Sequence, residues 1–105
     1  MTAPAQNRQE VLERLAAARE RLAALGVLSI GLFGSFATGR QTPESDVDIL
    51  VEFAPEHHSF DNFMEVSFLL EDILARKVEL VTPQALSPHI GPHILREVQR
   101  VRIAS

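Results

Sequence analysis

The stretch that decides the fold is residues 34–53, which read GSFATGRQTPESDVDILVEF. It opens with Gly34-Ser35 at the end of one apolar run and reaches Asp46-Val47-Asp48 at the start of another. A glycine at the end of a strand lets the backbone come close to a ligand, because no β-carbon stands in the way. The serine hydroxyl and the amides of a helix that starts there can donate hydrogen bonds to phosphate oxygens. These features together predict a phosphate-binding turn beside a pair of carboxylates.

Asp46 and Asp48 stand two positions apart on a predicted strand, so their side chains point to the same side, about 6–7 Å apart along the backbone. Carboxylates placed in this way can converge on one or two magnesium ions. Without a cation, the two negative charges repel each other. An Asp-x-Asp pattern alone is more often a solvated strand face or turn. Its position between two apolar strands, ten residues after the Gly-Ser pair, favours a site.

Hydrophobic periodicity on both sides of this stretch predicts helices and strands along the chain. Capping and breaking residues mark their limits, as Gly26 does after the first helix and Ser59 does before the middle helix. The expected elements, in chain order, are a helix over 8–25, a strand over 27–33, a short helix from Phe36, a strand over 45–53, a helix over 60–75 and a strand over 77–81. The pattern therefore indicates one α/β unit with its strands in the middle of the chain.

The two ends of the chain give weaker patterns. Residues 1–7 predict a loose, flexible tail, and the proline that follows a capping residue in Thr82-Pro83 and Ser87-Pro88 predicts two short helical turns. Apolar residues at helical spacing predict a final amphipathic helix, namely Ile94, Leu95, Val98 and Val101.

Composition limits the classes of function. The chain has 105 residues, of which 46% are hydrophobic, so we expect a single domain over 1–105. It has no cysteine, which suits a cytoplasmic location, and we find no apolar run long enough to cross a bilayer. A net charge of −4 without a block of Lys or Arg argues against duplex nucleic acid as the main partner. A nucleoside triphosphate remains possible, because metal ions and a few local donors can balance its charge.

Residues 34–53 resemble the DNA polymerase β-type nucleotidyltransferase superfamily, and in particular its minimal nucleotidyltransferase branch. The likeness covers nearly the whole chain, through IGLFGSFATG, SDVDILVEF, KVELVTPQAL and the terminal ILREV. It implies a palm-like fold with a small mixed β-sheet flanked by helices. It implies further that Gly34 and Ser35 bind the nucleotide phosphates, and that Asp46 and Asp48 are catalytic metal ligands.

The resemblance also implies a reaction and a partner. Members of this branch are commonly antitoxins paired with an all-helical HEPN-domain ribonuclease toxin. Some of them silence the toxin by transferring AMP from ATP to one of its tyrosines. For this chain the implied cofactor is Mg²⁺, as two ions, and the implied substrate is ATP. The sequence leaves open the preferred nucleotide, the acceptor residue and any oligomer.

Two positions depart from the family pattern. The third carboxylate is Glu79 where relatives usually have aspartate, and we expect it to serve as a ligand or a base. In the GSFATG turn, relatives often carry arginines where this chain has Phe36 and Thr38. We expect Arg40 to supply the missing positive charge at the triphosphate, and Ser45 to be a further nucleotide contact.

The sequence is compatible with three functions. The first is transfer of AMP to a hydroxyl of a protein partner, with Glu79 assisting its deprotonation. The second is an antitoxin that neutralises its partner by contact, with weak or lost transfer. The third is a nucleotidyltransferase for small molecules, similar to enzymes that modify aminoglycosides, although such enzymes usually need an additional acceptor-binding domain. The predicted middle helix has a wide apolar face, on which Met64 and Phe68 could extend into a protein interface.

Overall fold

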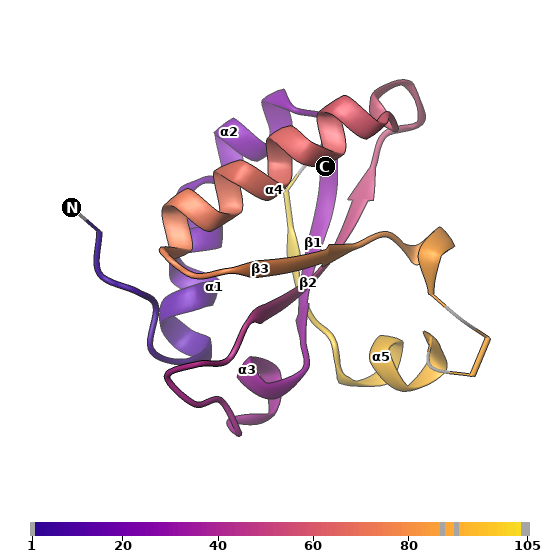
Figure 1. Cartoon of the computed structure of the whole chain (residues 1–105). Coiled ribbons are helices and arrows are strands. Elements are labelled where there is room, and N and C mark those ends of the chain that lie inside the picture. Colours follow the sequence, from indigo (N-terminus) through magenta and orange to yellow (C-terminus); the bar gives the residue numbers. More distant parts are fainter. Residues whose placement is uncertain (1, 87, 90, 104–105) are drawn as a thin grey trace.

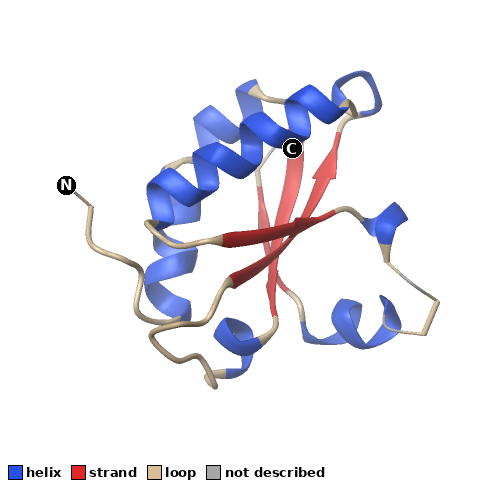
Figure 2. Ribbon diagram, viewed as in Figure 1, coloured by secondary structure: helices blue, strands red, loops and turns tan. Residues whose placement is uncertain are grey.

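The computed structural model describes residues 2–86, 88–89 and 91–103, and a four-stranded sheet forms its centre (Figures 1 and 2). The strands lie in the order β3-β2-β1-β4. β1 is antiparallel to both β2 and β4, whereas β3 is parallel to β2. Their bounds are Val27–Phe33 for β1, Val47–Phe53 for β2, Val78–Val81 for β3 and Gln99–Arg102 for β4. The small mixed sheet implied by the family resemblance is therefore confirmed.

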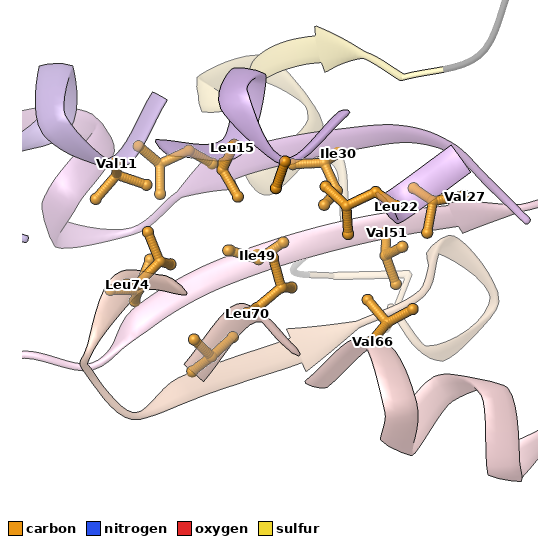
Figure 3. Packing of buried hydrophobic residues seen from close by; sticks show 14 of the residues in the cluster. Val11, Leu15, Leu22, Val27, Ile30, Ile49, Val51, Val66, Leu70 and Leu74 are labelled. Atoms are coloured by element: carbon orange, nitrogen blue, oxygen red, sulfur yellow. The ribbon is translucent and has the colours of Figure 1, made fainter. Parts of the chain in front are cut away.

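Helices α1 (Arg8–Ala17), α2 (Arg19–Ala24) and α4 (Phe60–Leu74) cover one face of the sheet (Figure 2). Their apolar side chains interlock with those of the central strands (Figure 3). Each of the following core residues has 0% exposure: Val11, Leu15, Leu22, Ile30, Ile49, Val51, Val66, Leu70 and Leu74. Burial of this size stabilises the fold by roughly 1.5–3 kcal/mol for each large side chain.

The first helical segment differs slightly from its prediction. Ala18 leaves the helical conformation, with φ −93° and ψ 9°, and divides the expected helix into α1 and α2. Gly26 ends the second part at φ +83°, in the left-handed region that glycine adopts without strain. A β-carbon on Gly26 would also meet the His57 side chain at 2.2 Å, so this position requires glycine.

Alternation on β2 separates the two faces of the sheet. Val47, Ile49, Val51 and Phe53 are buried on the helix side. On the other side Asp48 is half-buried and Glu52 is exposed.

A single-turn helix, α3 (Ser35–Thr38), follows β1, and the 3₁₀ turns are η1 (Pro55–His57) and η2 (Pro83–Ala85). The turn expected at Thr82-Pro83 is therefore confirmed, whereas the one expected at Ser87 lies outside the described residues.

The prediction of one amphipathic helix at the end of the chain is confirmed at Ile94 and Leu95 and wrong at Val98 and Val101. Helix α5 (Gly91–Glu97) stops before Val98, and Gln99–Arg102 forms strand β4. Val101 lies opposite Ile30 of β1 in the antiparallel register. Short apolar patterns fit a helix and a strand equally well, and here the unpaired backbone edge of β1 decides the outcome by pairing with the chain end.

The prediction of a loose tail over residues 1–7 is also wrong in part. Ala5 is fully buried, and its amide donates to the Leu74 carbonyl at 3.0 Å. Asn7 caps α1, because its side-chain oxygen accepts from the amide of Glu10 at 2.9 Å. A short polar sequence gives no sign of the bond between Ala5 and Leu74, whose partners lie far apart in the chain. Among the described residues, no helix is both long enough and apolar enough to span a bilayer.

Candidate functional site

The Gly-Ser turn and the aspartates meet at the end of β1. Gly34 follows that strand with φ +73° and ψ −153°, a conformation that is essentially restricted to glycine. A β-carbon built on Gly34 would lie 2.1 Å from Oδ2 of Asp48, so the carboxylate occupies the space that any other side chain would fill. The group that comes close to this glycine in the structure is therefore the carboxylate of Asp48, the metal-ligand candidate.

Strand register brings the third carboxylate to the same place. Asp48 on β2 lies opposite Phe33 of antiparallel β1 and opposite Glu79 of parallel β3. Directly opposed residues in a sheet project to the same face, so Asp48 and Glu79 are neighbours on the face away from the helices. Glu79 is exposed, and its side chain is free of core packing. The structure thus places Glu79 beside Asp48.

The carboxylates influence one another electrostatically. The pKa of Asp48 is raised above its ordinary value, first because partial burial penalises the charged form. Repulsion from the carboxylate of Glu79 raises this pKa further, and repulsion from Asp46 adds a smaller contribution. A cluster of like charges at a half-buried carboxylate is the arrangement that a bound cation relieves.

The predicted phosphate-binding residues Gly34, Ser35 and Arg40 lie at a shallow hollow of about 280 Å³. Gly34, Ser35, Thr38 and Arg40 line it. The hydroxyl of Thr38 donates to the Gly34 carbonyl at 3.2 Å, and Nε of Arg40 donates to Oγ1 of Thr38 at 3.3 Å. The Ser35 hydroxyl and the Arg40 guanidinium in this hollow are donors of the kind that bind a phosphate group. Arg40, which the sequence analysis predicts at the triphosphate, thus lies in this hollow, where Thr38 accepts its hydrogen bond.

Asp46 and Ser45 lie in a second hollow of about 340 Å³, which Arg76 and Lys77 also line. The Ser45 hydroxyl accepts a hydrogen bond from the amide of Thr42 at 2.8 Å. This bond closes the loop on itself, so the structure gives Ser45 a local role in the turn. Asp46 still affects the pKa of Asp48, so it lies at the boundary between this hollow and the carboxylate cluster.

The donor set suits a magnesium ion that is shared with a substrate. Within residues 2–86, 88–89 and 91–103, no three His, Cys, Asp or Glu residues are gathered closely enough to hold a metal by themselves. Magnesium is usually held by one or two carboxylates, by water and by the phosphates of the substrate, rather than by a cage made of protein alone. Asp48 with Asp46 or Glu79 fits that description, because each pair offers two carboxylates as hard oxygen ligands.

Comparison with known proteins agrees with this geometry. The family model for the nucleotidyltransferase domain matches residues 12–103. The protein adenylyltransferase MntA of Thermococcus cleftensis is 44% identical over 80 residues, covering 76% of this chain and 77% of that protein. A solved structure of a minimal nucleotidyltransferase superposes with a TM-score of 0.78 at 26% identity, covering 90% of this chain and 95% of the other.

A second solved structure supports the fold. It is a toxin–antitoxin complex with AMP-PNP, matched with a TM-score of 0.64 at 23% identity over 90% of this chain and 72% of that one. The family expected from the Gly-Ser and Asp-Val-Asp motifs is thus confirmed by sequence and by structure. The chain belongs to the nucleotidyltransferase domain family and is a nucleotidyltransferase of the minimal kind.

Proposed function

We propose that this chain is a magnesium-dependent protein adenylyltransferase and acts as an antitoxin. It would transfer AMP from ATP to a hydroxyl, in particular that of a tyrosine, on an all-helical HEPN-type ribonuclease toxin. The observation that carries the proposal is the contact between Gly34 and the Asp48 carboxylate, which joins the phosphate turn to the metal ligands. The name of the relative with 44% identity, protein adenylyltransferase MntA, supports a protein as acceptor.

The residues divide the chemistry between them. Gly34 and Ser35 would contact the triphosphate, and Arg40 would balance part of its negative charge. Asp46 and Asp48 would hold magnesium, as two ions, which when bound neutralises charge on the phosphate oxygens. The acceptor oxygen forms a bond to the α-phosphorus while the bond from that phosphorus to the bridging oxygen breaks, and pyrophosphate leaves. Glu79 would take the proton of the acceptor hydroxyl. Most of the rate enhancement would come from positioning and charge neutralisation.

Helix α4 offers a surface for the toxin. Phe60 is 76% exposed and Phe68 is 61% exposed, and they lie two helical turns apart with Met64 between them. Next to them, an apolar hollow of about 290 Å³ is lined in part by Phe53, Phe60, Phe63, Leu80 and Val81. This hollow contains no member of the carboxylate cluster, so we assign it to docking and not to nucleotide binding.

The charge of α4 favours another protein over a second copy of this chain. The helix carries Asp61, Glu65, Glu71 and Asp72, and no Lys or Arg occurs between Arg40 and Arg76. Two such helices face to face would place like charges together, which costs free energy. A helix of the toxin with basic residues beside apolar anchors complements this surface in both respects.

One assay compares the proposal with its rivals. The protein is mixed with labelled ATP, Mg²⁺ and the product of the neighbouring reading frame, and label on that product is measured. We expect label that Asp48→Asn abolishes. Neutralisation of the toxin that survives the double variant Asp46→Asn and Asp48→Asn, without label transfer, would instead support the antitoxin that acts by contact. Label on an aminoglycoside and none on protein would support the small-molecule enzyme.

A further inference from the structure

Arg76 connects the two halves of the site without lying in either motif. It follows α4 in the short link to β3, after Ala75, which has a left-handed backbone with φ +52°. Its Nη1 donates to the carbonyls of Pro43 and Ser45, at 3.0 and 3.1 Å. Both carbonyls belong to the loop that leads into Asp46. The first metal-ligand candidate is therefore preceded by a loop that one guanidinium ties to the end of α4.

The same guanidinium also reaches the phosphate turn. Its carbon lies 5.1 Å from the ring centroid of Phe36, in cation–π geometry. Phe36 is fully buried and directly follows Ser35 in α3, so the ring is an anchor for the turn. On a third side, Nε of Arg76 donates to the Ala5 carbonyl, which fixes the guanidinium plane. Arg76 thus contacts both the ring that anchors the turn and the loop before Asp46.

Asp46 is held from both sides by the link between α4 and β3. Arg76 binds the carbonyl of the residue before it, Ser45, and the carbonyl of Lys77 accepts from the amide of the residue after it, Val47, at 3.0 Å. This restraint opposes the tendency of Asp46 to move away from the like charges of the cluster. Sequence patterns give no reason to select Arg76, because its partners are backbone carbonyls and one distant ring.

We propose that Arg76 is a positioning residue for the nucleotidyl transfer, which fixes Asp46 relative to Gly34 and Ser35 and so sets the affinity for magnesium–ATP. The inference rests on the proposed function. A lysine would keep the positive charge but not the planar guanidinium that binds three carbonyls and stacks on a ring. Arg76 touches no substrate in this role, and its effect passes through the loop at 43–46.

Arg14 provides a matched control. Its Nη1 donates to two carbonyls at the end of α4, those of Ile73 and Leu74, at 3.2 Å each. It therefore joins α1 to α4 through the same kind of bond, but it contacts neither the turn nor the aspartate loop. Losing either arginine removes bonds between a guanidinium and backbone carbonyls, so both Arg14→Met and Arg76→Met should lower the Tm.

The test is the Kd for magnesium–ATP, measured well below the Tm of each variant. We expect Arg76→Met to weaken binding about tenfold or more, since misplacement of a binding group by about 1 Å is costly, and Arg76→Lys to recover part of the loss. Arg14→Met should bind as the wild type does. Wild-type affinity in Arg76→Met would overturn the inference and leave Arg76 a purely structural residue. If Arg76→Met does not fold, Arg76→Lys is judged by the same criterion.

A second measurement separates this inference from the proposed function. If the wild-type protein does not bind magnesium–ATP, the proposed function fails whatever Arg76 does. Hydrogen exchange of the Asp46 and Val47 amides then tests whether Arg76 holds Asp46 in place. Exchange that is faster in Arg76→Met than in Arg14→Met supports its role in placing Asp46, and equal exchange in the two variants contradicts it.

Discussion

The Asp48 carboxylate occupies the position in which Gly34 would carry a β-carbon, with Oδ2 only 2.1 Å from that point. A residue of the turn and a residue of the neighbouring strand are therefore mutually dependent. The glycine allows the carboxylate to approach the phosphate turn, and the carboxylate prevents any side chain at position 34. Several measurable consequences follow from this contact and from the charges around it.

Gly34→Ala should destabilise the protein by on the order of 3 kcal/mol, the upper end for backbone strain of this kind, because the new methyl group also collides with Asp48. Gly39→Ala is the control. Gly39 has a similar φ of +77°, but a β-carbon there would meet no atom within 4 Å. It should cost about 1–2 kcal/mol, the ordinary price of a left-handed residue. Urea unfolding compares the two, and equal losses would argue against close packing of the carboxylate.

Asp48→Asn should raise the Tm of the metal-free protein at neutral pH, measured in EDTA. The folded-state pKa of Asp48 is raised, so the ionised form opposes folding. This penalty is absent below the unfolded-state pKa and is fully present once the pH has risen through the folded-state pKa. The advantage of asparagine should therefore vanish in acid.

Mg²⁺ should reverse this ranking at neutral pH. We expect the ion to raise the Tm of the wild type, because binding to the folded state stabilises it, and to have little effect on Asp48→Asn. Glu65→Gln, which removes an exposed charge from α4, is the control and should respond to Mg²⁺ as the wild type does. A wild type whose Tm is indifferent to Mg²⁺ would argue against Asp48 as a ligand.

Glu79→Gln should lower kcat for AMP transfer by about 10²-fold, the lower end for loss of a general base, and leave the KM for ATP nearly unchanged. Glu52→Gln is the control, since Glu52 lies on the same face of the sheet and accepts a hydrogen bond from Ser29 at 3.1 Å, away from the cluster. Steady-state kinetics on the labelled toxin separates the two constants. An unchanged kcat would leave Glu79 as an exposed strand residue.

Arg40→Met should weaken magnesium–ATP binding about tenfold, because a hydrogen bond to a charged group contributes roughly 1.5–3 kcal/mol. Arg40 is exposed, so the Tm should change little. Arg21→Met removes a comparable exposed arginine from α2 and should leave the Kd unaltered. Calorimetric titration measures both variants, and equal affinities would mean that Arg40 plays no part in balancing the triphosphate.

Phe68→Asp should weaken the complex with the toxin at least tenfold without lowering the Tm by more than a few degrees, since Phe68 is largely exposed. Ala16→Asp introduces the same charge at an exposed position of α1 and is the control. Co-purification of the neighbouring gene product, followed by titration, measures the effect. Equal binding by the two variants would exclude this face of α4 from the interface.

Much of the candidate site followed from the sequence. Gly34, Ser35, Asp46 and Asp48 are close in the chain, and their chemistry depends on local rules: a turn that needs glycine, and strand periodicity that puts two carboxylates on one side. The family resemblance added Glu79, and the strand register places it opposite Asp48. The prediction that the final helix includes Val98 and Val101 was wrong, because valines at this spacing fit a helix or a strand. Pairing with β1 makes residues 99–102 a strand.

The sequence by itself thus determined the elements that rest on local periodicity and on the motif, namely the turn, the carboxylate strand and the order of helices and strands before residue 82. Tertiary structure alone decided how those pieces are held. Arg76 reaches Ala5, Ser45 and Phe36, which lie 31 to 71 residues away in the chain. Every residue has a backbone carbonyl, so the residue types at the accepting positions do not indicate that an arginine binds there. Only the folded chain therefore reveals which guanidinium fixes the site.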